Sequence, residues 1–336
     1  MKAVTLHGFT YNQLRLEERP EPAVGPRDIK IRVRAASINF RDRLIIGGQY
    51  GIPADALPLV PLSDGAGEVV EVGRLVSQLH VGDRVTTMMT RDWDGGALTP
   101  MRFAAQNGGP LDGVLQEFVV LHERAVVPFP PHLSYEEAST LPIAAVTAWS
   151  ALTEGGVGPD KTVLILGTGN VSLFGLQLAK AAGARVIATT SREDRIPSLM
   201  TAGADIALNY QTHPDWPNAV VEATEGRGAD IVIEVAGLQN IDKSLAALRH
   251  GGYVGVVGFL AGLGAPPDFT FSLLYKNARL RGVITGSRDT YEDMNRVLTN
   301  HRIRPVIDKV FDFADFREAL AHYDSGRAFG KVVVRL

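Results

Sequence analysis

An apolar run, a glycine-rich turn and an amphipathic pattern follow one another in residues 161–180, and this stretch constrains the fold most. Residues 162–166 are apolar or β-branched throughout, which is typical of a strand buried on both faces. From Val171 onward, apolar residues recur at helical spacing on one face. The turn between them reads Gly167-Thr-Gly169-Asn-Val-Ser172. Strand before and helix after are the context that gives such a turn meaning.

The turn has the properties that a dinucleotide pyrophosphate requires. Gly167 can adopt backbone angles that a Cβ would penalise, and Gly169 lets the main chain approach the phosphates. The helix that follows would offer free N–H groups and a positive dipole end. Ser172 stands where a third glycine or alanine usually packs helix against strand, and it is small enough to do so. We therefore predict a dinucleotide site at Gly167, Gly169, Asn170, Val171 and Ser172; a structural glycine turn is the alternative.

The tip of the next strand indicates which dinucleotide binds. Residues 184–190 read as a strand, and the chain continues Thr190-Ser191-Arg192. An NAD site usually carries an acid about 20 residues beyond the first glycine, and none occurs in this tip before Glu193. Hydroxyls followed by a guanidinium suit a 2′-phosphate, so Thr190, Ser191 and Arg192 predict NADPH. Ser191 also fits a helix N-cap, because residues 191–194 match a capping box, and both roles can coexist.

Composition excludes several classes of function. The 336 residues are 45% hydrophobic and carry a net charge of -3, which indicates an ordinary soluble protein of two domains. We expect no nucleic-acid partner and no membrane, because there is no basic field. Cysteine is absent, which excludes disulfides, a Cys nucleophile and thiolate-bound zinc. The N-terminus alternates like a strand and lacks a signal-peptide core, so a cytoplasmic location is expected.

Pattern along the chain predicts two kinds of structure. Residues 1–121 show short strands with frequent Gly and Pro turns, typical of a small barrel or sandwich. Strands and helices then alternate from residue 162 to residue 257, with a sixth strand at 279–284, as in a doubly wound parallel sheet. The tail adds two helices and a strand at 331–336. It is too short for a domain and is expected to return to the β-rich part.

Several motifs together resemble a known family over the full length. They are Ala36-Ser-Ile-Asn-Phe-Arg-Asp42, Gly65-Ala-Gly-Glu-Val-Val-Glu-Val-Gly73, Val81-Gly-Asp-Arg-Val85, Leu141-Pro-Ile-Ala-Ala-Val-Thr-Ala-Trp149, the glycine turn and Phe329-Gly-Lys-Val-Val333. The chain is similar to the zinc-independent, quinone-oxidoreductase-like branch of the medium-chain dehydrogenase/reductase superfamily. The resemblance implies an α/β protein with a GroES-like β-rich catalytic domain (1–121 plus 287–336) and a Rossmann NADP-binding domain (122–286).

Departures from the zinc enzymes of that superfamily are equally informative. Those enzymes place a catalytic Cys where Asn39 stands and a Gly-His-Glu where Ser63 and Asp64 precede Gly65. Their third ligand would fall near Ile143, which cannot bind a metal. Their structural zinc lobe would need four cysteines around residues 90–112. We therefore expect a metal-free protein.

The resemblance also implies the catalytic residues, in a cleft between the domains. Asn39 would lie near the nicotinamide, and Tyr50 falls where related enoyl thioester reductases carry a proton-donating tyrosine. A neutral phenol is a suitable donor to an oxyanion. Alternatively, Tyr50 covers a loop and Asn39 fixes a turn. Arg41 and Asp42 could pair with each other or with nearby backbone, and only Arg41 could stabilise substrate charge.

Further cofactor contacts come from several strand ends. Thr147 resembles a residue that contacts the nicotinamide in relatives, and an ordinary helix hydroxyl is its alternative. Lys331 could reach cofactor or substrate, or be a solvated surface lysine, and Tyr210 could lie against the adenosine or serve packing. The remaining candidates lie at the carboxyl edge of the sheet, where ligands bind in such folds: Ala236, Gly237, Gly258 and Phe259.

Two further segments bear on substrate and assembly. The Gly-rich residues 91–112 could close over an apolar substrate, pack as an inert flap or contact another subunit. The sixth strand would be a sheet edge that relatives use to pair subunits, so we expect a homodimer. The leading hypothesis is an NADPH-dependent, zinc-free reductase of a quinone or an α,β-unsaturated carbonyl compound (enone or enoyl). The alternatives are a zinc-free NADP-dependent alcohol or carbonyl oxidoreductase, and a non-catalytic NADPH-binding protein.

Overall fold

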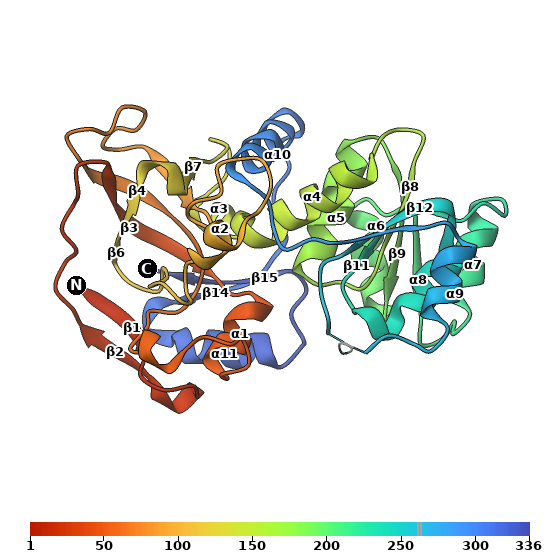
Figure 1. Cartoon of the computed structure of the whole chain (residues 1–336), viewed down its shortest axis with the longest axis horizontal. Coiled ribbons are helices and arrows are strands. Elements are labelled where there is room, and N and C mark those ends of the chain that lie inside the picture. Colours follow the sequence, from red (N-terminus) through yellow and green to blue (C-terminus); the bar gives the residue numbers. More distant parts are fainter. Residues whose placement is uncertain (261, 263) are drawn as a thin grey trace. The chain divides into compact units, whose positions relative to one another are not determined.

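The computed structural model describes residues 1–260, 262 and 264–336, and the chain divides into two compact units (Figure 1). The first comprises Met1–Val146 and Gly286–Leu336, and the second comprises Thr147–Thr285. Residues 122–146 thus belong to the first unit, whereas the sequence analysis placed them in the second. The reason is strand pairing: β7 (Val126–Pro128) joins the edge of the first unit's sheet beside β5 (Arg84–Thr87).

The first unit is built on a seven-stranded sheet. Its order is β14-β15-β3-β4-β5-β7, with β6 also paired to β3, and a two-stranded sheet β1-β2 lies apart from it. The bounds of the strands not yet given are β1 (Lys2–Leu6), β2 (Leu14–Glu18), β3 (Asp28–Ser37), β4 (Asp64–Val72), β6 (Phe118–His122), β14 (Ile307–Asp312) and β15 (Lys331–Arg335). Strand β15 runs antiparallel to β3, with Val334 opposite Ala36, so the tail is part of this unit.

Helices of the first unit connect or flank these strands. They are α1 (Phe40–Ile46), α2 (Pro100–Ala104), α3 (Tyr135–Ala138), α10 (Arg288–His301) and α11 (Phe316–Asp324). Alternation along β3 buries Ile29, Ile31 and Val33 in an apolar core, because successive side chains of a strand point to opposite faces. A second apolar cluster of this unit includes residues of β1 and β15.

The second unit is a six-stranded sheet in which every pairing is parallel. The strand order β10-β9-β8-β11-β12-β13 is that of a Rossmann fold, so the predicted doubly wound sheet is confirmed. The strands are β8 (Thr162–Ile165), β9 (Arg185–Thr190), β10 (Ile206–Asn209), β11 (Ala229–Glu234), β12 (Leu248–Val256) and β13 (Arg279–Gly282). The helices of at least six residues are α4 (Val146–Gly155), which begins at the last residue of the first unit, α5 (Asn170–Ala181), α6 (Ile196–Thr201), α7 (Trp216–Ala223), α8 (Ile241–Ala247) and α9 (Phe269–Tyr275).

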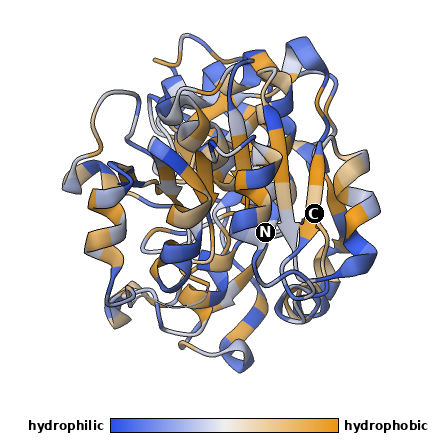
Figure 2. Cartoon of the chain, turned by 90° about the vertical axis from the view of Figure 1, so that its right-hand side faces the viewer, coloured by the Kyte–Doolittle hydropathy of each residue, from blue (hydrophilic) through white to orange (hydrophobic). Residues whose placement is uncertain are grey.

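Burial explains why the central strands of this sheet are rich in apolar residues. Every residue of β8 and of β11 is buried, and apolar residues dominate the strands in Figure 2. Helix α5 packs closely on the sheet, because a Cβ on Gly175 would lie 2.7 Å from Cδ1 of Ile233. The turn that precedes α5 is therefore held against the carboxyl end of the sheet. Among the described residues, no helix is long and apolar enough to cross a membrane.

Candidate active site and cofactor site

The positions that hold the catalytic zinc in related enzymes converge in this chain. Asn39 immediately precedes α1, and Asp64 begins β4. Ser37 pairs with Asp64 and with Val333, so β4 and β15 flank β3 and bring these ends together (Figure 1). The main-chain N–H of Ile143 donates a hydrogen bond to Oδ2 of Asp64 at 3.2 Å.

Lys331 lies inside this cluster. Its side chain is only 1% exposed, so the alternative of a solvated surface lysine is wrong. The ammonium donates to the carbonyl oxygen of Ile38 at 3.0 Å and to Oδ1 of Asn39 at 2.8 Å. Its distance to Oδ2 of Asp64 is 3.8 Å. The first residue of β15 therefore brings a positive charge to the centre of the site.

Burial dominates the protonation of these groups. It raises the pKa of Asp64 to about 7, although the Lys331 ammonium and the Asn39 amide favour the carboxylate. Burial also lowers the pKa of Lys331, against the attraction of Asp64 and Asp42. The pKa of Asp42 is raised for the same reason, with Arg41 opposing the shift. A buried pair of this kind persists only when additional hydrogen bonds satisfy it, as Ile38, Asn39 and Ile143 do here.

Two complementary atoms in the cluster remain without a well-aligned hydrogen bond. They are the donor Nδ2 of Asn39 and the acceptor Oδ1 of Asp64, and both are shielded from solvent. A buried polar atom without a partner costs about 1–3 kcal/mol. The two atoms lie near each other, because the Asn39 amide acts on the Asp64 carboxylate.

These residues do not fit a zinc ion. Oδ1 of Asn39 already accepts a hydrogen bond from an ammonium, and a cation beside that ammonium would be repelled. Ile143 contributes only an N–H, and Ser63 is held by Arg41. Across the described part of the chain, no cluster of three or more His, Cys, Asp or Glu residues could hold a metal. The donor set is that of an ion pair with an amide, and zinc would require at least three lone-pair ligands.

Arg41, next to the cluster around Lys331, forms hydrogen bonds that hold a neighbouring loop in place. It is 8% exposed, and its guanidinium donates to Oε1 of Gln106 at 2.8 Å and to the carbonyl oxygens of Asn107 at 2.8 Å and Gly109 at 3.0 Å. It also donates to Oγ of Ser63. The predicted pairing with nearby backbone is therefore the role the structure gives Arg41. These bonds hold the end of the 91–112 segment.

The second predicted catalytic residue, Tyr50, covers this arginine. The Cζ atom of Arg41 lies 4.9 Å from the centre of the Tyr50 ring, a cation–π distance. Tyr50 is half-buried, and Arg41 connects it to the helix that Asn39 begins. The main-chain N–H of Asn39 donates to Oδ2 of Asp42 at 2.8 Å, so Asn39 also fixes a turn. Its two predicted roles use different atoms and are compatible.

In the second unit, the glycine turn forms an open cradle. Gly167 has φ +73°, a left-handed conformation that favours glycine. A Cβ on Gly167 or Gly169 would meet no atom within 4 Å, so space next to the main chain is free. Gly169 is the N-cap of α5, and the main-chain N–H groups of the first helical residues, Asn170 and Val171, have no partner within a helix. Ser172 is buried, and its hydroxyl donates to the carbonyl oxygen of Leu166 at 2.7 Å, which closes the turn.

The tip of β9 differs from the predicted arrangement. Arg192 pairs with Asp194 through two hydrogen bonds, of 3.0 and 2.6 Å, and both side chains are largely exposed. Arg195 instead donates to the hydroxyl of Thr168, inside the glycine turn. Ser191 does not cap a helix, because the helical residues begin with the 3₁₀ turn Glu193–Arg195. Sequence reasoning missed Arg195, although its place one helical turn after Arg192 was a usable signal.

Loops at the carboxyl edge of the sheet pack main chain against main chain. Gly237 has φ +101°, and a Cβ there would lie 2.7 Å from Cα of Phe259. A Cβ on Gly258 would lie 2.4 Å from the carbonyl oxygen of Val235. The structure thus brings the predicted residues Ala236, Gly237, Gly258 and Phe259 together at one edge.

Glu234 holds the first of these loops in place, and sequence reasoning missed it. Its buried carboxylate accepts N–H bonds from Ala236 at 2.7 Å and from Gly237 at 3.1 Å. It also accepts from Asn240 at 3.3 Å and from the hydroxyl of Ser244. Burial raises the pKa of Glu234 despite these donors. Its signal was a charged residue directly after the apolar run of residues 231–233.

The remaining predicted cofactor contacts occupy different places in the second unit. The main-chain N–H of Tyr210 donates to the carbonyl oxygen of Thr190 at 2.9 Å, which puts Tyr210 beside the β9 tip with its side chain 40% exposed. Thr147 is buried, and its hydroxyl donates to the carbonyl oxygen of Ile284 at 3.2 Å. Its alternative as an ordinary helix hydroxyl bonded to the preceding turn is therefore not realised.

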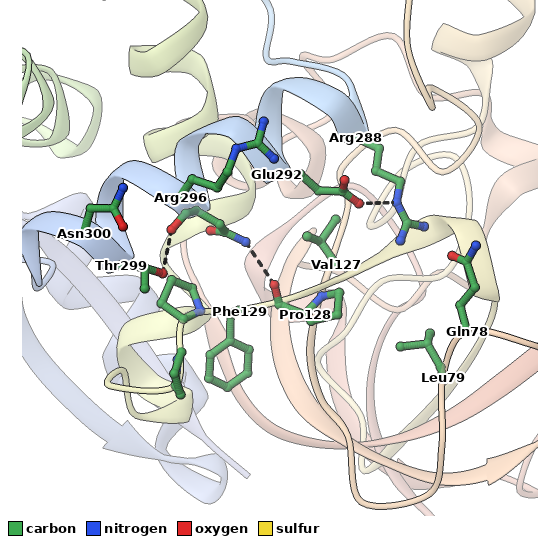
Figure 3. Close-up of a pocket in the computed structure, with 13 residues that line it drawn as sticks. Gln78, Leu79, Val127, Pro128, Phe129, Arg288, Glu292, Arg296, Thr299 and Asn300 are labelled. Atoms are coloured by element: carbon green, nitrogen blue, oxygen red, sulfur yellow. Dashed lines mark hydrogen bonds and ion pairs between the residues drawn. The ribbon is translucent and has the colours of Figure 1, made fainter.

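A groove of the first unit lies elsewhere than the predicted catalytic residues (Figure 3). It has a volume of about 440 Å³ and runs between α10 and the segment that follows β7. Phe129 and neighbouring prolines form an apolar floor, and Arg288, paired with Glu292, lies on its wall. None of the lining residues is a predicted site residue. This groove is therefore a surface feature separate from the buried cluster around Lys331.

A Rossmann sheet with a glycine cradle, together with a β-rich unit that carries a buried polar cluster, defines a nicotinamide-dependent oxidoreductase class. Residues 25–131 match the alcohol dehydrogenase GroES-like domain, and residues 171–300 match the zinc-binding dehydrogenase family. The chain belongs to the medium-chain dehydrogenase/reductase superfamily, as the sequence motifs predicted.

Individual relatives differ in what they are named for. A zinc-type alcohol dehydrogenase-like protein of Schizosaccharomyces pombe is 39% identical over 97% of this chain and 96% of its own length. A 2-methylene-furan-3-one reductase of Solanum lycopersicum is 31% identical over 93% of this chain and 73% of its own. The crystal structure of a putative alcohol dehydrogenase from Sinorhizobium meliloti superimposes with a TM-score of 0.93 at 38% identity, covering 100% of this chain and 98% of that one.

Proposed function

We propose that this protein is a zinc-independent, NADPH-dependent reductase that transfers hydride to a quinone or an α,β-unsaturated carbonyl compound. The observation that carries the proposal is the Lys331 ammonium bonded to Asn39 at 2.8 Å, where zinc relatives bind their metal. An oxidoreductase without a Lewis acid needs hydrogen-bond donors for the oxygen on which charge develops. The resemblance to an enone-type reductase over 93% of the chain also supports this acceptor class.

The roles of the residues follow from their environments. Bound NADPH would supply the hydride. Nδ2 of Asn39, buried and without a well-aligned partner, donates a hydrogen bond to the acceptor oxygen. Tyr50, held over Arg41, supplies the proton that the reduced acceptor needs, or water does so in its place. Arg41 takes no part in the transfer, because its guanidinium bonds hold the 106–109 segment.

Tyr50→Phe tests the proton-donor assignment. It removes the hydroxyl and keeps the ring that covers Arg41. We expect turnover to fall by about 10²-fold, the usual contribution of a positioned acid, with NADPH affinity unchanged. Unchanged turnover would assign the proton to water.

We assign the 2′-phosphate of NADPH to Arg195 rather than to Arg192. Arg195 lies against Thr168 of the glycine turn, whereas Arg192 is bidentate with Asp194 and turned to solvent. Tyr210 lies beside Thr190 at the β9 tip, and the acid that follows the tip, Glu193, is bonded to Asn209. Loss of a guanidinium–phosphate bond costs about 1.5–3 kcal/mol, which is roughly 10- to 150-fold in affinity.

Two matched variants test this assignment. Arg195→Ala should weaken NADPH by that factor and leave NADH nearly unchanged, whereas Arg192→Ala should change both little. Titration of each variant with both nucleotides, followed by fluorescence, gives the four affinities. Equal loss for NADPH and NADH in Arg195→Ala would overturn the phosphate assignment. A selective loss in Arg192→Ala would restore the prediction made from sequence.

The acceptor class is decided by turnover. NADPH oxidation at 340 nm would be followed with a naphthoquinone, an enone, an enoyl thioester and a saturated aldehyde, with NADH in parallel. Turnover of the quinone, the enone or the enoyl thioester, with the saturated aldehyde inactive, supports the proposal. One of the relatives above is named alcohol dehydrogenase-like and another is titled an alcohol dehydrogenase, which favours a carbonyl or alcohol oxidoreductase as the second candidate. Equal turnover of the aldehyde, and alcohol oxidation with NADP⁺, would establish that candidate instead.

We further propose that two copies of the chain pair through the edge of the second unit's sheet. Among the described strands, β13 pairs with β12 alone, so one of its edges is unpaired. On α9, Phe271, Leu274 and Tyr275 are 71%, 73% and 64% exposed, an apolar face unusual for a surface helix. Light scattering should give the mass of a dimer, and Leu280→Pro in β13 should give that of a monomer. A monomeric wild type at micromolar concentration refutes this assembly.

A further inference from the structure

The Lys331 ammonium, at the centre of the first unit's polar cluster, determines the orientation of the Asn39 amide. An ammonium can only donate hydrogen bonds, so Lys331 must face the oxygen of the Asn39 amide and not its nitrogen. The 2.8 Å bond between Nζ and Oδ1 therefore determines which way the amide is turned. Nδ2, the other terminal atom of the planar amide, is turned away from the ammonium, close to Asp64 and without a well-aligned partner.

The position of Lys331 is itself determined by three protein groups. Its ammonium bonds the carbonyl oxygen of Ile38 and lies 3.8 Å from the Asp64 carboxylate. Its main-chain N–H donates to the carbonyl oxygen of Val306 at 3.0 Å, which holds the start of β15 in place. A fully buried lysine with these contacts has little freedom to reach a cofactor. The predicted role of Lys331 as a cofactor ligand therefore conflicts with its surroundings.

We propose that Lys331 is a positioning residue that replaces the metal ion of zinc relatives: it holds the Asn39 amide with Oδ1 inward, so that Nδ2 is the donor to the acceptor oxygen. The inference rests on the proposed role of Asn39. In zinc enzymes a cation acts on the substrate oxygen directly. Here the Lys331 ammonium would act indirectly, by setting the orientation of the Asn39 amide.

A double-mutant cycle on Lys331 and Asn39 tests this relation. Asn39→Ala removes the donor, and Lys331→Met removes the group that orients it while keeping the length of the side chain. Each single variant should lower kcat/KM for the acceptor by about 10²-fold, the effect expected of a misplaced catalytic group. The double variant should be no worse than Asn39→Ala, because Lys331 acts only through Asn39. Affinity for NADPH should be the same in all four proteins.

Other outcomes separate the competing roles. Independent losses that multiply to about 10⁴-fold in the double variant would overturn the positioning role. A loss of NADPH affinity in Lys331→Met, with kcat unchanged, would make Lys331 a cofactor ligand instead. Full activity of Asn39→Ala would refute the proposed function of Asn39 and, with it, this inference.

Lys331→Met alone leaves Asp64 buried without its partner and could therefore misfold. A variant that lacks both charges controls for this effect. Asp64→Asn/Lys331→Met removes both charges together, and it should show the same loss of turnover as Lys331→Met. A second readout needs no substrate. The ¹⁵N side-chain signal of Asn39, assigned by its loss in Asn39→Ala, should change its chemical shift in the charge-free variant, because that variant lacks the ammonium bonded to Oδ1. An unchanged signal would show that Lys331 does not hold the amide.

Discussion

Asp64 should keep its proton far above the pH at which an ordinary aspartate loses it. The carboxyl is fully buried, and burial raises its pKa from 3.8 to about 7 despite the nearby Lys331 ammonium. In the unfolded chain the same group titrates at about pH 4. The folded protein therefore binds one proton more than the unfolded chain between about pH 4 and pH 7.

The sign of the effect on stability follows from this difference. Because the folded state binds the extra proton, the free energy of unfolding falls as the pH rises through this window. A difference of about 3 in pKa corresponds to about 4 kcal/mol in total, at no more than about 1.4 kcal/mol per pH unit. Lys331 acts in the opposite sense, because burial lowers its pKa and the folded state releases that proton first.

The assay compares the wild type with Asp64→Asn/Lys331→Met, which lacks both groups. Trp93 is the only tryptophan of the first unit, so Trp149→Phe and Trp216→Phe in both proteins make fluorescence report that unit alone. Between pH 4.5 and 6.5, urea unfolding should show the wild type losing about 2–3 kcal/mol relative to the variant. Parallel pH dependence in the two proteins, or a ¹³C titration of the Asp64 carboxyl near pH 4, would refute the reasoning.

Three further substitutions have expected effects on the two units. Gly67→Ala should destabilise the first unit by about 2–3 kcal/mol, because its Cβ would lie 2.2 Å from the carbonyl oxygen of Arg32; urea unfolding measures the loss, and a neutral result would contradict the packing. Tyr291→Phe should cost about 1 kcal/mol by removing the 2.7 Å bond to the hydroxyl of Thr86, and a change below about 0.3 kcal/mol would discount that bond. Glu234→Ala should cost about 3 kcal/mol or more, because it leaves several donors of the following loop without an acceptor, whereas Glu234→Gln should cost less; equal losses would show that the negative charge itself is needed.

Local patterns were sufficient for the second unit. The apolar run at β8, the turn at Gly167 and Gly169 and the period of α5 are properties of adjacent residues, and each reports its own conformation. The alternation of such segments then restricts the topology to a parallel sheet. The absence of cysteine and the identities of Asn39 and Ile143 likewise argued against a zinc site without any coordinates.

Local sequence patterns could not show which of two chemically similar side chains has which partner. Arg192 and Arg195 are three residues apart, and only the folded β9 tip turns one toward Asp194 and the other toward Thr168. The segment 122–146 reads as helical in part, yet the pairing of β7 with β5 places it in the first unit. In both cases the outcome depends on partners distant in sequence.

Lys331 is the clearest instance of a role decided by tertiary structure. In the sequence it is a lysine before an apolar strand, as suited to solvent as to a ligand. It is buried because β15 pairs with β3, which brings its ammonium to an amide 292 residues earlier in the chain. The local sequence specifies the strand and the charge, but the burial, the partner and the altered pKa come from neighbours that only the folded chain assembles. The environment of Lys331 therefore depends on how the strands of the sheet pair, whereas the fold that contains it can be predicted from the sequence.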